Sequence, residues 1–193
     1  EFLTEADTLV EAHIAGIPGD QFMREHLDDK HLDPVRLTKE FVKFCERCFV
    51  RLLGDMHAGN FVVDITPDFD RTTYRLRAID FDQQSYEGNL KVYQPNYYIE
   101  NNPIVRLGMK CMQPQTTRQY QQEERSLIGH RARAERARLH QLLDTMRADT
   151  LAPEAHVFEL REGLANFYAD DRFAHATSMG ELVERSLDRL GWA

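Results

Sequence analysis

Two short stretches carry most of the structural information in this sequence: Leu53-Gly54-Asp55-Met56-His57-Ala58-Gly59-Asn60-Phe61 and Ala78-Ile79-Asp80-Phe81-Asp82. Each places acidic or glycine residues beside an apolar run, which is typical of a loop that joins regular elements. Asp55 and Asn60 stand five positions apart in the first stretch, and Asp80 stands in the second. The segments around them determine whether these three side chains meet.

The segment before the first stretch is predicted to form a core helix over residues 34–52. Asp33 is suited to the N-cap, and Pro34 then falls at the first helical position. Gly54 ends the helix. Apolar residues recur at spacings of three and four and make one stripe: Leu37, Phe41, Phe44, Cys45, Cys48, Phe49 and Leu52.

Two runs typical of strands follow the first stretch. Residues 61–65 are short and rich in β-branched side chains, and residues 74–79 alternate between polar and apolar. Residues 66–73 between them are polar and contain a proline. We therefore predict a β-hairpin with a long loop. A hairpin that begins at Asn60 and ends at Asp80 brings those two side chains together at its open end.

The residue types at this open end are suited to phosphate chemistry. Asn60 and Asp80 offer an amide oxygen and a carboxylate, which are hard ligands for a Mg²⁺ ion that keeps waters and binds phosphates. Asp55, on the same loop, could accept a proton from an attacking hydroxyl. Phosphoryl transfer requires a metal, a positioned phosphate and a base near the nucleophile.

These motifs resemble the protein-kinase-like superfamily and are closest to the branch that contains aminoglycoside phosphotransferases and choline kinases. Enzymes of that branch typically show His-Gly-Asp-x-His-x-x-Asn and then Ile-Asp-[Phe/Trp]-[Glu/Asp]. The resemblance implies that Asp55 is the catalytic-loop aspartate. It implies that Asn60 and Asp80 hold Mg²⁺ on the phosphates of ATP. His57 matches a histidine common in this branch, and either orients the loop, which we favour, or contacts phosphate.

The sequence also departs from the family pattern. Leu53 replaces the histidine that usually braces the loop, so we expect hydrophobic bracing. The interval of 20 residues from Asn60 to Asp80 implies an insertion in the hairpin. The residues before Asp55 contain no glycine-rich phosphate loop and no strand lysine, and the chain begins with Glu1 rather than Met. We therefore expect a C-lobe fragment whose N-lobe is not present in this chain.

The expected architecture is mainly α with a small β-hairpin, in one protein-kinase-like C-terminal lobe over residues 1–193. Within it we expect a hinge-side segment over 1–33, the catalytic core helix, loop and hairpin over 34–82, and a helical remainder over 83–193. The remainder is predicted to contain one long helix over 116–148, a second that starts at Pro153, and a last one that Ser178 opens with a capping box.

The composition of the chain excludes several classes of protein. The 193 residues carry a formal charge of −8, which argues against a nucleic-acid binder. No apolar run approaches the roughly 18 residues of a membrane span. Three cysteines make no disulfide framework, so we expect a cytoplasmic protein.

Several other patterns have a plain structural interpretation beside a functional one. Cys45 and Cys48 spell C-x-x-C, but both lie on the apolar stripe and no second pair exists, so core packing is favoured over a metal or redox site. The Arg-rich run 131–138 could bind an acidic partner, although a solvated helix face with ion pairs is favoured. The tyrosines at 86, 93, 97 and 98 either line an acceptor pocket or pack the lobe.

We predict an ATP- and Mg²⁺-dependent phosphotransferase that moves the γ-phosphoryl group to a hydroxyl acceptor, on either a small molecule or a protein. This chain would be its C-lobe, inactive when isolated. The alternative with the same fold is a non-catalytic kinase-like binding or regulatory module. Retention of Asp55, Asn60 and Asp80 argues against that alternative. An unrelated helical interaction protein would leave these three residues dispersed.

Overall fold

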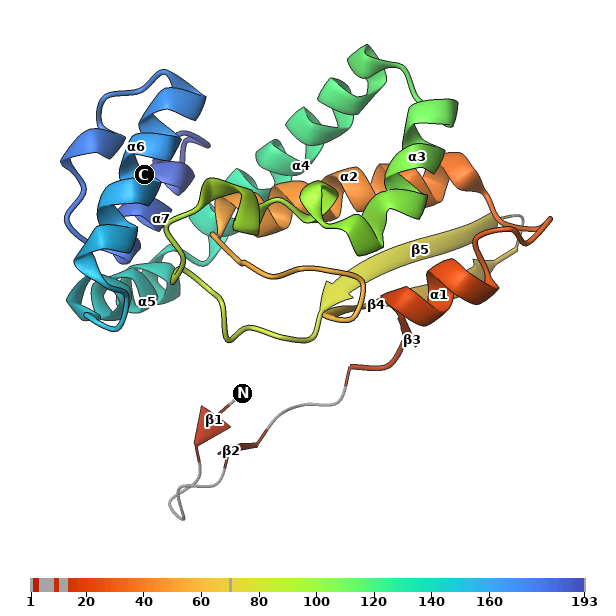
Figure 1. The fold of residues 1–193 in the computed structure, drawn as a ribbon, viewed down its shortest axis with the longest axis horizontal. Coiled ribbons are helices and arrows are strands. Elements are labelled where there is room, and N and C mark those ends of the chain that lie inside the picture. Colours follow the sequence, from red (N-terminus) through yellow and green to blue (C-terminus); the bar gives the residue numbers. More distant parts are fainter. Residues whose placement is uncertain (1, 4–8, 11–13, 70, 193) are drawn as a thin grey trace.

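The computed structural model describes residues 2–3, 9–10, 14–69 and 71–192 (Figure 1). The chain is mainly helical, with a two-stranded and a three-stranded antiparallel sheet. The strands are β1 (Phe2–Leu3), β2 (Leu9–Val10), β3 (Ile17–Pro18), β4 (Phe61–Asp68) and β5 (Arg71–Ala78). The α-helices are α1 (Gly19–Glu25), α2 (Pro34–Val50), α3 (Asn102–Cys111), α4 (Pro114–Ala134), α5 (Arg136–Ala148), α6 (Glu154–Tyr168) and α7 (Met179–Asp188).

Helix α2 forms where the sequence predicted it. The Asp33 carboxylate accepts hydrogen bonds from the backbone N–H groups of Val35 and Arg36, so it is the N-cap, and Pro34 opens the helix. Cys48 is buried on the apolar face and Cys45 is partly buried beside it. Burial raises the pKa of both thiols, and neither is in a disulfide. The prediction that this pair serves core packing is confirmed.

The hairpin strands are longer than predicted, and the expected polar loop over residues 66–73 is wrong. The antiparallel ladder runs from Phe61 opposite Ala78 to Asp68 opposite Arg71. Residues 60 and 79 form a hydrogen-bonded pair, so by alternation Pro67 falls at a non-hydrogen-bonded position. Its nitrogen then points away from β5, and the ladder loses no bond.

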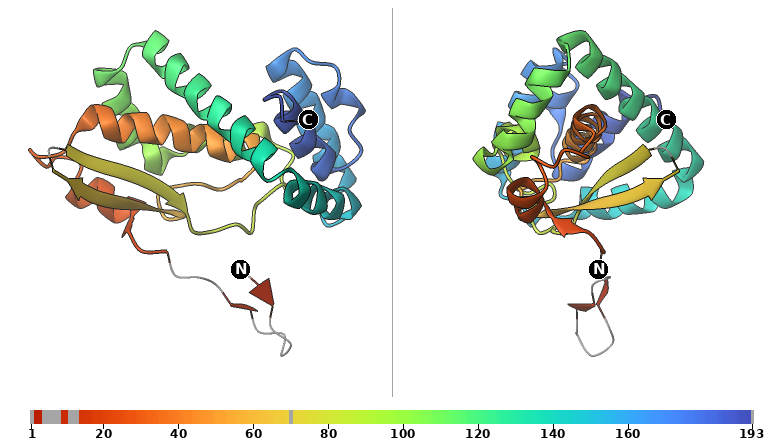
Figure 2. Two further views of the ribbon diagram at one scale, coloured as in Figure 1. Left: turned by 180° about the vertical axis from the view of Figure 1, so that it is seen from behind. Right: turned by 90° about the vertical axis from the view of Figure 1, so that its right-hand side faces the viewer.

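Helix α2 is the central element of the fold. It lies between the β4–β5 hairpin on one side and α3 and α4 on the other, while α5, α6 and α7 gather beyond its C-terminal end (Figures 1 and 2). One apolar core joins α2 to the hairpin and includes Phe44, Phe61 and Leu76. A second core, which includes Leu143, Leu160 and Trp192, joins the C-terminal helices.

The predicted single helix over 116–148 is also wrong, because the chain bends at Glu135 between α4 and α5. The bend directs Leu143 into the C-terminal core, where it is fully buried. A straight helix would carry that side chain away from this core. The Arg-rich run 131–138 spans the bend, and its four arginines are exposed, as expected of a solvated face.

The other helical predictions for this region are confirmed. Pro153 stands directly before α6, and the Ser178 hydroxyl accepts from the backbone N–H of Glu181 at the start of α7. No helix within the described residues is long and apolar enough to cross a membrane.

Candidate functional site

The loop after α2 begins with a turn that local sequence alone would not favour. Leu52 and Asp55 both have left-handed backbone conformations, with φ of 49° and 55°. Aspartate tolerates this conformation, whereas leucine rarely adopts it. Between them, a Cβ on Gly54 would lie 2.8 Å from the Gln83 carbonyl oxygen and 2.9 Å from Val92 Cγ1. Glycine is therefore needed where the loop passes residues 83–92.

Asp55 and Asn60 are brought together across this loop. The Asn60 amide Nδ2 donates to the Asp55 backbone oxygen at 2.8 Å and to Asp55 Oδ2 at 3.3 Å. The backbone N–H of Asn60 donates to the carbonyl of His57 at 2.9 Å. The amide therefore closes the loop and holds one carboxylate oxygen of Asp55, while Oδ1 has no hydrogen-bond partner among the residues that the structure describes.

Asp80 follows the end of β5 and lies beside Asn60 along the backbone. The N–H of Ile79 donates to the carbonyl of Asn60 at 3.0 Å, which continues the hairpin ladder by one residue. Asp80 Oδ1 accepts from the backbone N–H of Asp82 at 3.2 Å and shapes the turn after it. The backbone before Asp80 is therefore paired with Asn60 at the open end of the hairpin, and the Asn60 amide binds Asp55. That the Asn60 and Asp80 side chains act together stays a prediction.

His57 has a role in the shape of the loop. Its Nδ1 accepts from the backbone N–H of Gly59 at 3.0 Å, which places the proton of the neutral ring on Nε2. The ring meets Tyr98 edge to face, with centroids 6.3 Å apart. Burial, and then the nearby charge of Asp55, raises the pKa of Tyr98 to about 12. These contacts agree with the orienting role that we favoured for His57.

Asn101 anchors the loop from the interior of the protein, and the sequence analysis did not identify it. The side chain is fully buried, and its Nδ2 donates to the backbone oxygens of Met56 at 2.9 Å and Pro95 at 2.7 Å. Its Oδ1 has no hydrogen-bond partner among the described residues. An asparagine ahead of Asn102-Pro103 suggests a helix start, and no pattern marks it as an anchor.

Hydrophobic bracing of the loop is also present. Leu53 is buried in the core between α2 and the hairpin, together with Met56 and Ala58. The N-terminus of α1 supports the same loop, because the N–H of Asp20 donates to the carbonyl of Ala58 at 2.9 Å.

The oxygens at the open end suit a hard cation. Over the described residues, no hydrogen bond or ion pair uses Asn60 Oδ1 or Asp80 Oδ2. An amide and a carboxylate oxygen fit Mg²⁺, which takes its other ligands from water and phosphate. The part of the chain that the structure describes has no cluster of three or more His, Cys, Asp or Glu side chains that could hold a metal. A cation here would therefore need further ligands from water or from a bound phosphate group.

A separate cavity of about 590 Å³ lies between α2, α3 and α4. Its lining includes Phe41 and Phe49 of α2 and Ile104 of α3, with the Glu46–Arg125 ion pair on its wall. None of the four predicted site residues lines this cavity. The candidate site at the hairpin end and the apolar cavity are therefore distinct features.

No protein-family model matches the chain, and comparison with curated proteins and with solved structures finds no match. A function for the chain therefore rests on its sequence motifs and on the geometry of the loop and the hairpin.

Proposed function

We propose that this chain is the C-lobe of a kinase-like phosphotransferase that moves the γ-phosphoryl group of ATP to a hydroxyl. The observation that carries the proposal is the junction of Asp55, Asn60 and Asp80. The amide of Asn60 binds Asp55, and the backbone of Asn60 pairs with the residue before Asp80. The proposal takes this junction as the place where one base and two hard oxygens serve phosphoryl transfer.

Each residue would have a definite task. Asp55, oriented by the Asn60 amide, would accept the proton of the attacking hydroxyl through its free oxygen. Asn60 Oδ1 and Asp80 would hold Mg²⁺, which neutralises phosphate charge when bound. His57 would keep the loop in shape through its bond to the N–H of Gly59.

The proposal also implies partners. A glycine-rich loop and a strand lysine are needed to hold the phosphates from the opposite side, and an N-lobe would supply them. The acceptor hydroxyl belongs to a small molecule or a protein. Free Cys45, Cys48 and Cys111 and the use of ATP fit a cytoplasmic location.

Calorimetric titration of the chain with Mg·ATP tests the proposal. Asp80→Asn keeps the oxygen that accepts from the N–H of Asp82 but removes the charge. Asp64→Asn is the matched control, because Asp64 pairs with Arg77 at 3.0 Å on the hairpin and has no part in the site. We expect Asp80→Asn to weaken binding about tenfold or more, and Asp64→Asn to bind like the wild type.

Two outcomes would count against the proposal. Equal binding by Asp80→Asn and the wild type would remove Asp80 from the metal site. No binding by the wild-type chain would show that it holds no preformed half-site for the nucleotide.

A further inference from the structure

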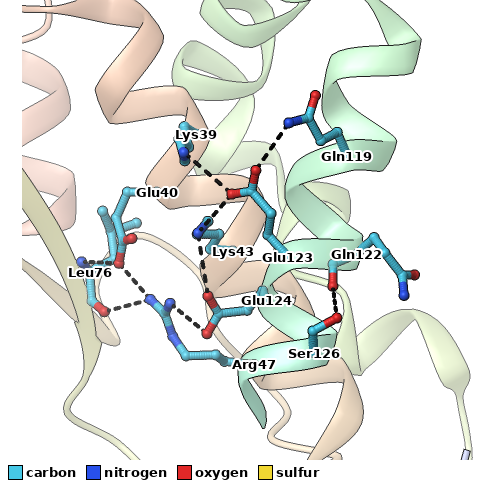
Figure 3. A network of polar contacts seen from close by, with 10 residues as sticks. All are labelled: Lys39, Glu40, Lys43, Arg47, Leu76, Gln119, Gln122, Glu123, Glu124 and Ser126. Carbon is cyan, nitrogen blue, oxygen red and sulfur yellow. Dashed lines mark hydrogen bonds and ion pairs between the residues drawn. The ribbon is translucent and has the colours of Figure 1, made fainter. Parts of the chain in front are cut away.

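A network of charged side chains joins α2 to α4 and to β5 (Figure 3). Arg47 lies at its centre. Its Nη2 contacts Glu40 Oε1 at 2.6 Å, and its Nη1 contacts Glu124 Oε1 of α4 at 3.3 Å. Glu40 and Arg47 are seven positions apart on α2, two helical turns, so they project from the same face. The outer part of the network joins Lys39 and Lys43 to Glu123.

The inner pair also binds the backbone of β5. Glu40 Oε1 accepts from the N–H of Leu76 at 3.2 Å, and Arg47 Nη2 donates to the carbonyl of Leu76 at 3.2 Å (Figure 3). β5 is an edge strand, since the sheet order is β3-β4-β5. Leu76 stands opposite Val63 at a non-hydrogen-bonded position, so its N–H and C=O point away from β4. Glu40 and Arg47 satisfy both groups, as a neighbouring strand would.

We propose that Glu40 and Arg47 are positioning residues that hold β5, and with it Asp80, against the helix that leads into Asp55. Leu76 of β5 lies four residues before Asp80, and Arg47 of α2 lies eight residues before Asp55. The bridge therefore fixes the two chain segments shortly before each enters the candidate site. The inference rests on the proposed function for the role of Asp80, but the bridge itself is tested separately.

Because Glu40 and Arg47 are largely buried, each charge needs the opposite charge beside it. The side chains of Arg47 and Glu40 are 21% and 16% exposed, and that of Glu124 is 3% exposed. Burial alone would disfavour the charge on Arg47, but Glu40 and Glu124 outweigh it and raise its pKa. The guanidinium stays charged and donates to two carboxylates and one carbonyl. A lysine ammonium is a single point charge and cannot match this planar set.

Amide hydrogen exchange in the full chain tests the bridge, read at Leu76 and at Ile79, whose N–H binds Asn60 beside Asp80. In Arg47→Lys we expect both amides to exchange about two- to tenfold faster, the factor that one hydrogen bond contributes. Glu40→Gln keeps an acceptor for Leu76 and should change the Leu76 amide less than Glu40→Leu does.

Arg125→Lys is the matched control. Arg125 contacts Glu46 at 2.7 Å, so this pair also joins α4 to α2 at a site that is largely buried, but within the described residues it makes no bond to β5. We expect this variant to leave both amides within about twofold of the wild type, below the effect of one hydrogen bond. Equal acceleration in the two variants would overturn the inference. Faster exchange at Leu76 with no change at Ile79 would overturn it as well.

A second readout separates the bridge from the proposed chemistry. Mn·ATP serves as the probe, because the cation needs further ligands from water and phosphate, and paramagnetic broadening of the Asn60 and Asp80 amides reports its binding. Arg47→Lys should weaken Mn·ATP binding, whereas Arg125→Lys should not. Binding is compared under conditions in which the unfolding curves show both variants to be fully folded. No broadening in the wild type would overturn the metal role of Asp80, while the exchange data would still decide the bridge.

Discussion

Replacement of Asn101 should expose how strongly the candidate loop depends on one buried side chain. Asn101→Leu removes the donors to the Met56 and Pro95 oxygens. The Met56 oxygen has no other partner among the described residues, so the loss of this hydrogen bond costs about 1–3 kcal/mol of stability. The Pro95 oxygen still accepts from the N–H of Tyr98 at 3.3 Å, so the loss of its hydrogen bond to Asn101 costs only about 0.5–1.5 kcal/mol. Leucine also removes the unpartnered Oδ1, which offsets about 1 kcal/mol. We expect a net loss of about 0.5–3.5 kcal/mol.

Asn101→Asp adds a signature in pH that Asn101→Leu lacks. The introduced carboxyl would lie fully buried against two carbonyl oxygens, so its pKa in the folded state rises above the unfolded value of about 3.9. The unfolded state then loses its proton first as pH rises. The extra loss of stability is absent below about pH 4 and grows by about 1.4 kcal/mol per pH unit above it, until the folded carboxyl ionises.

Urea unfolding followed by circular dichroism, at about pH 5 and about pH 7, measures both effects. The wild type supplies the background dependence on pH, and Asn101→Leu supplies the loss that does not depend on it. If the gap between Asn101→Asp and Asn101→Leu stays constant between the two pH values, the side chain is not buried between these carbonyls. The placement of the loop on Asn101 would then be wrong.

Three further predictions concern other parts of the chain. Asp33→Ala removes the N-cap bonds of α2 and should cost about 0.5–2 kcal/mol in thermal or urea unfolding, and Asp33→Asn should restore most of it. Gly54→Ala forces a Cβ to 2.8 Å from the Gln83 oxygen and should cost about 1–3 kcal/mol, so unchanged stability would contradict the close approach. Cys45 and Cys48 should be alkylated by iodoacetamide far more slowly in the folded chain than in urea, because burial raises both thiol pKa values, to about 12 for Cys48. Mass spectrometry of the labelled peptides checks this, and equal rates in the two states would refute it.

The parts of the fold that could be predicted are those determined by residues close together in the sequence. The N-cap, proline and apolar stripe of α2 lie within one segment, and so does the capping box of α7. The extension of β4 past Pro67 could not be read, because only the register shows that the proline nitrogen points away from its partner strand. The bend at Glu135 depends on a core formed by distant helices.

The candidate site divides in the same way. The loop and strand-end placement of Asp55, Asn60 and Asp80 follows from their own motifs, and their roles stay predictions. Asn101 lies 45 residues after Met56 in the chain, and no sequence pattern near it indicates the contact. Glu40 and Arg47 offered a weak signal, since two opposite charges two turns apart share a helix face. Their use as a strand partner needs the position of β5.

The left-handed turn at Leu52 and Asp55 has a consequence for the order of folding. Its shape is fixed by bonds from the N–H of Gly54 to the Gln83 oxygen and from the N–H of Asp55 to the Val92 oxygen. These contacts close loops of roughly 30 to 40 residues. The chain must lose the conformational entropy of these loops before the two hydrogen bonds can stabilise the turn. Helix α2 can form from local contacts alone, whereas the loop that it leads into must wait for residues 83–92 to dock. We expect the candidate site to be among the last regions to acquire native structure.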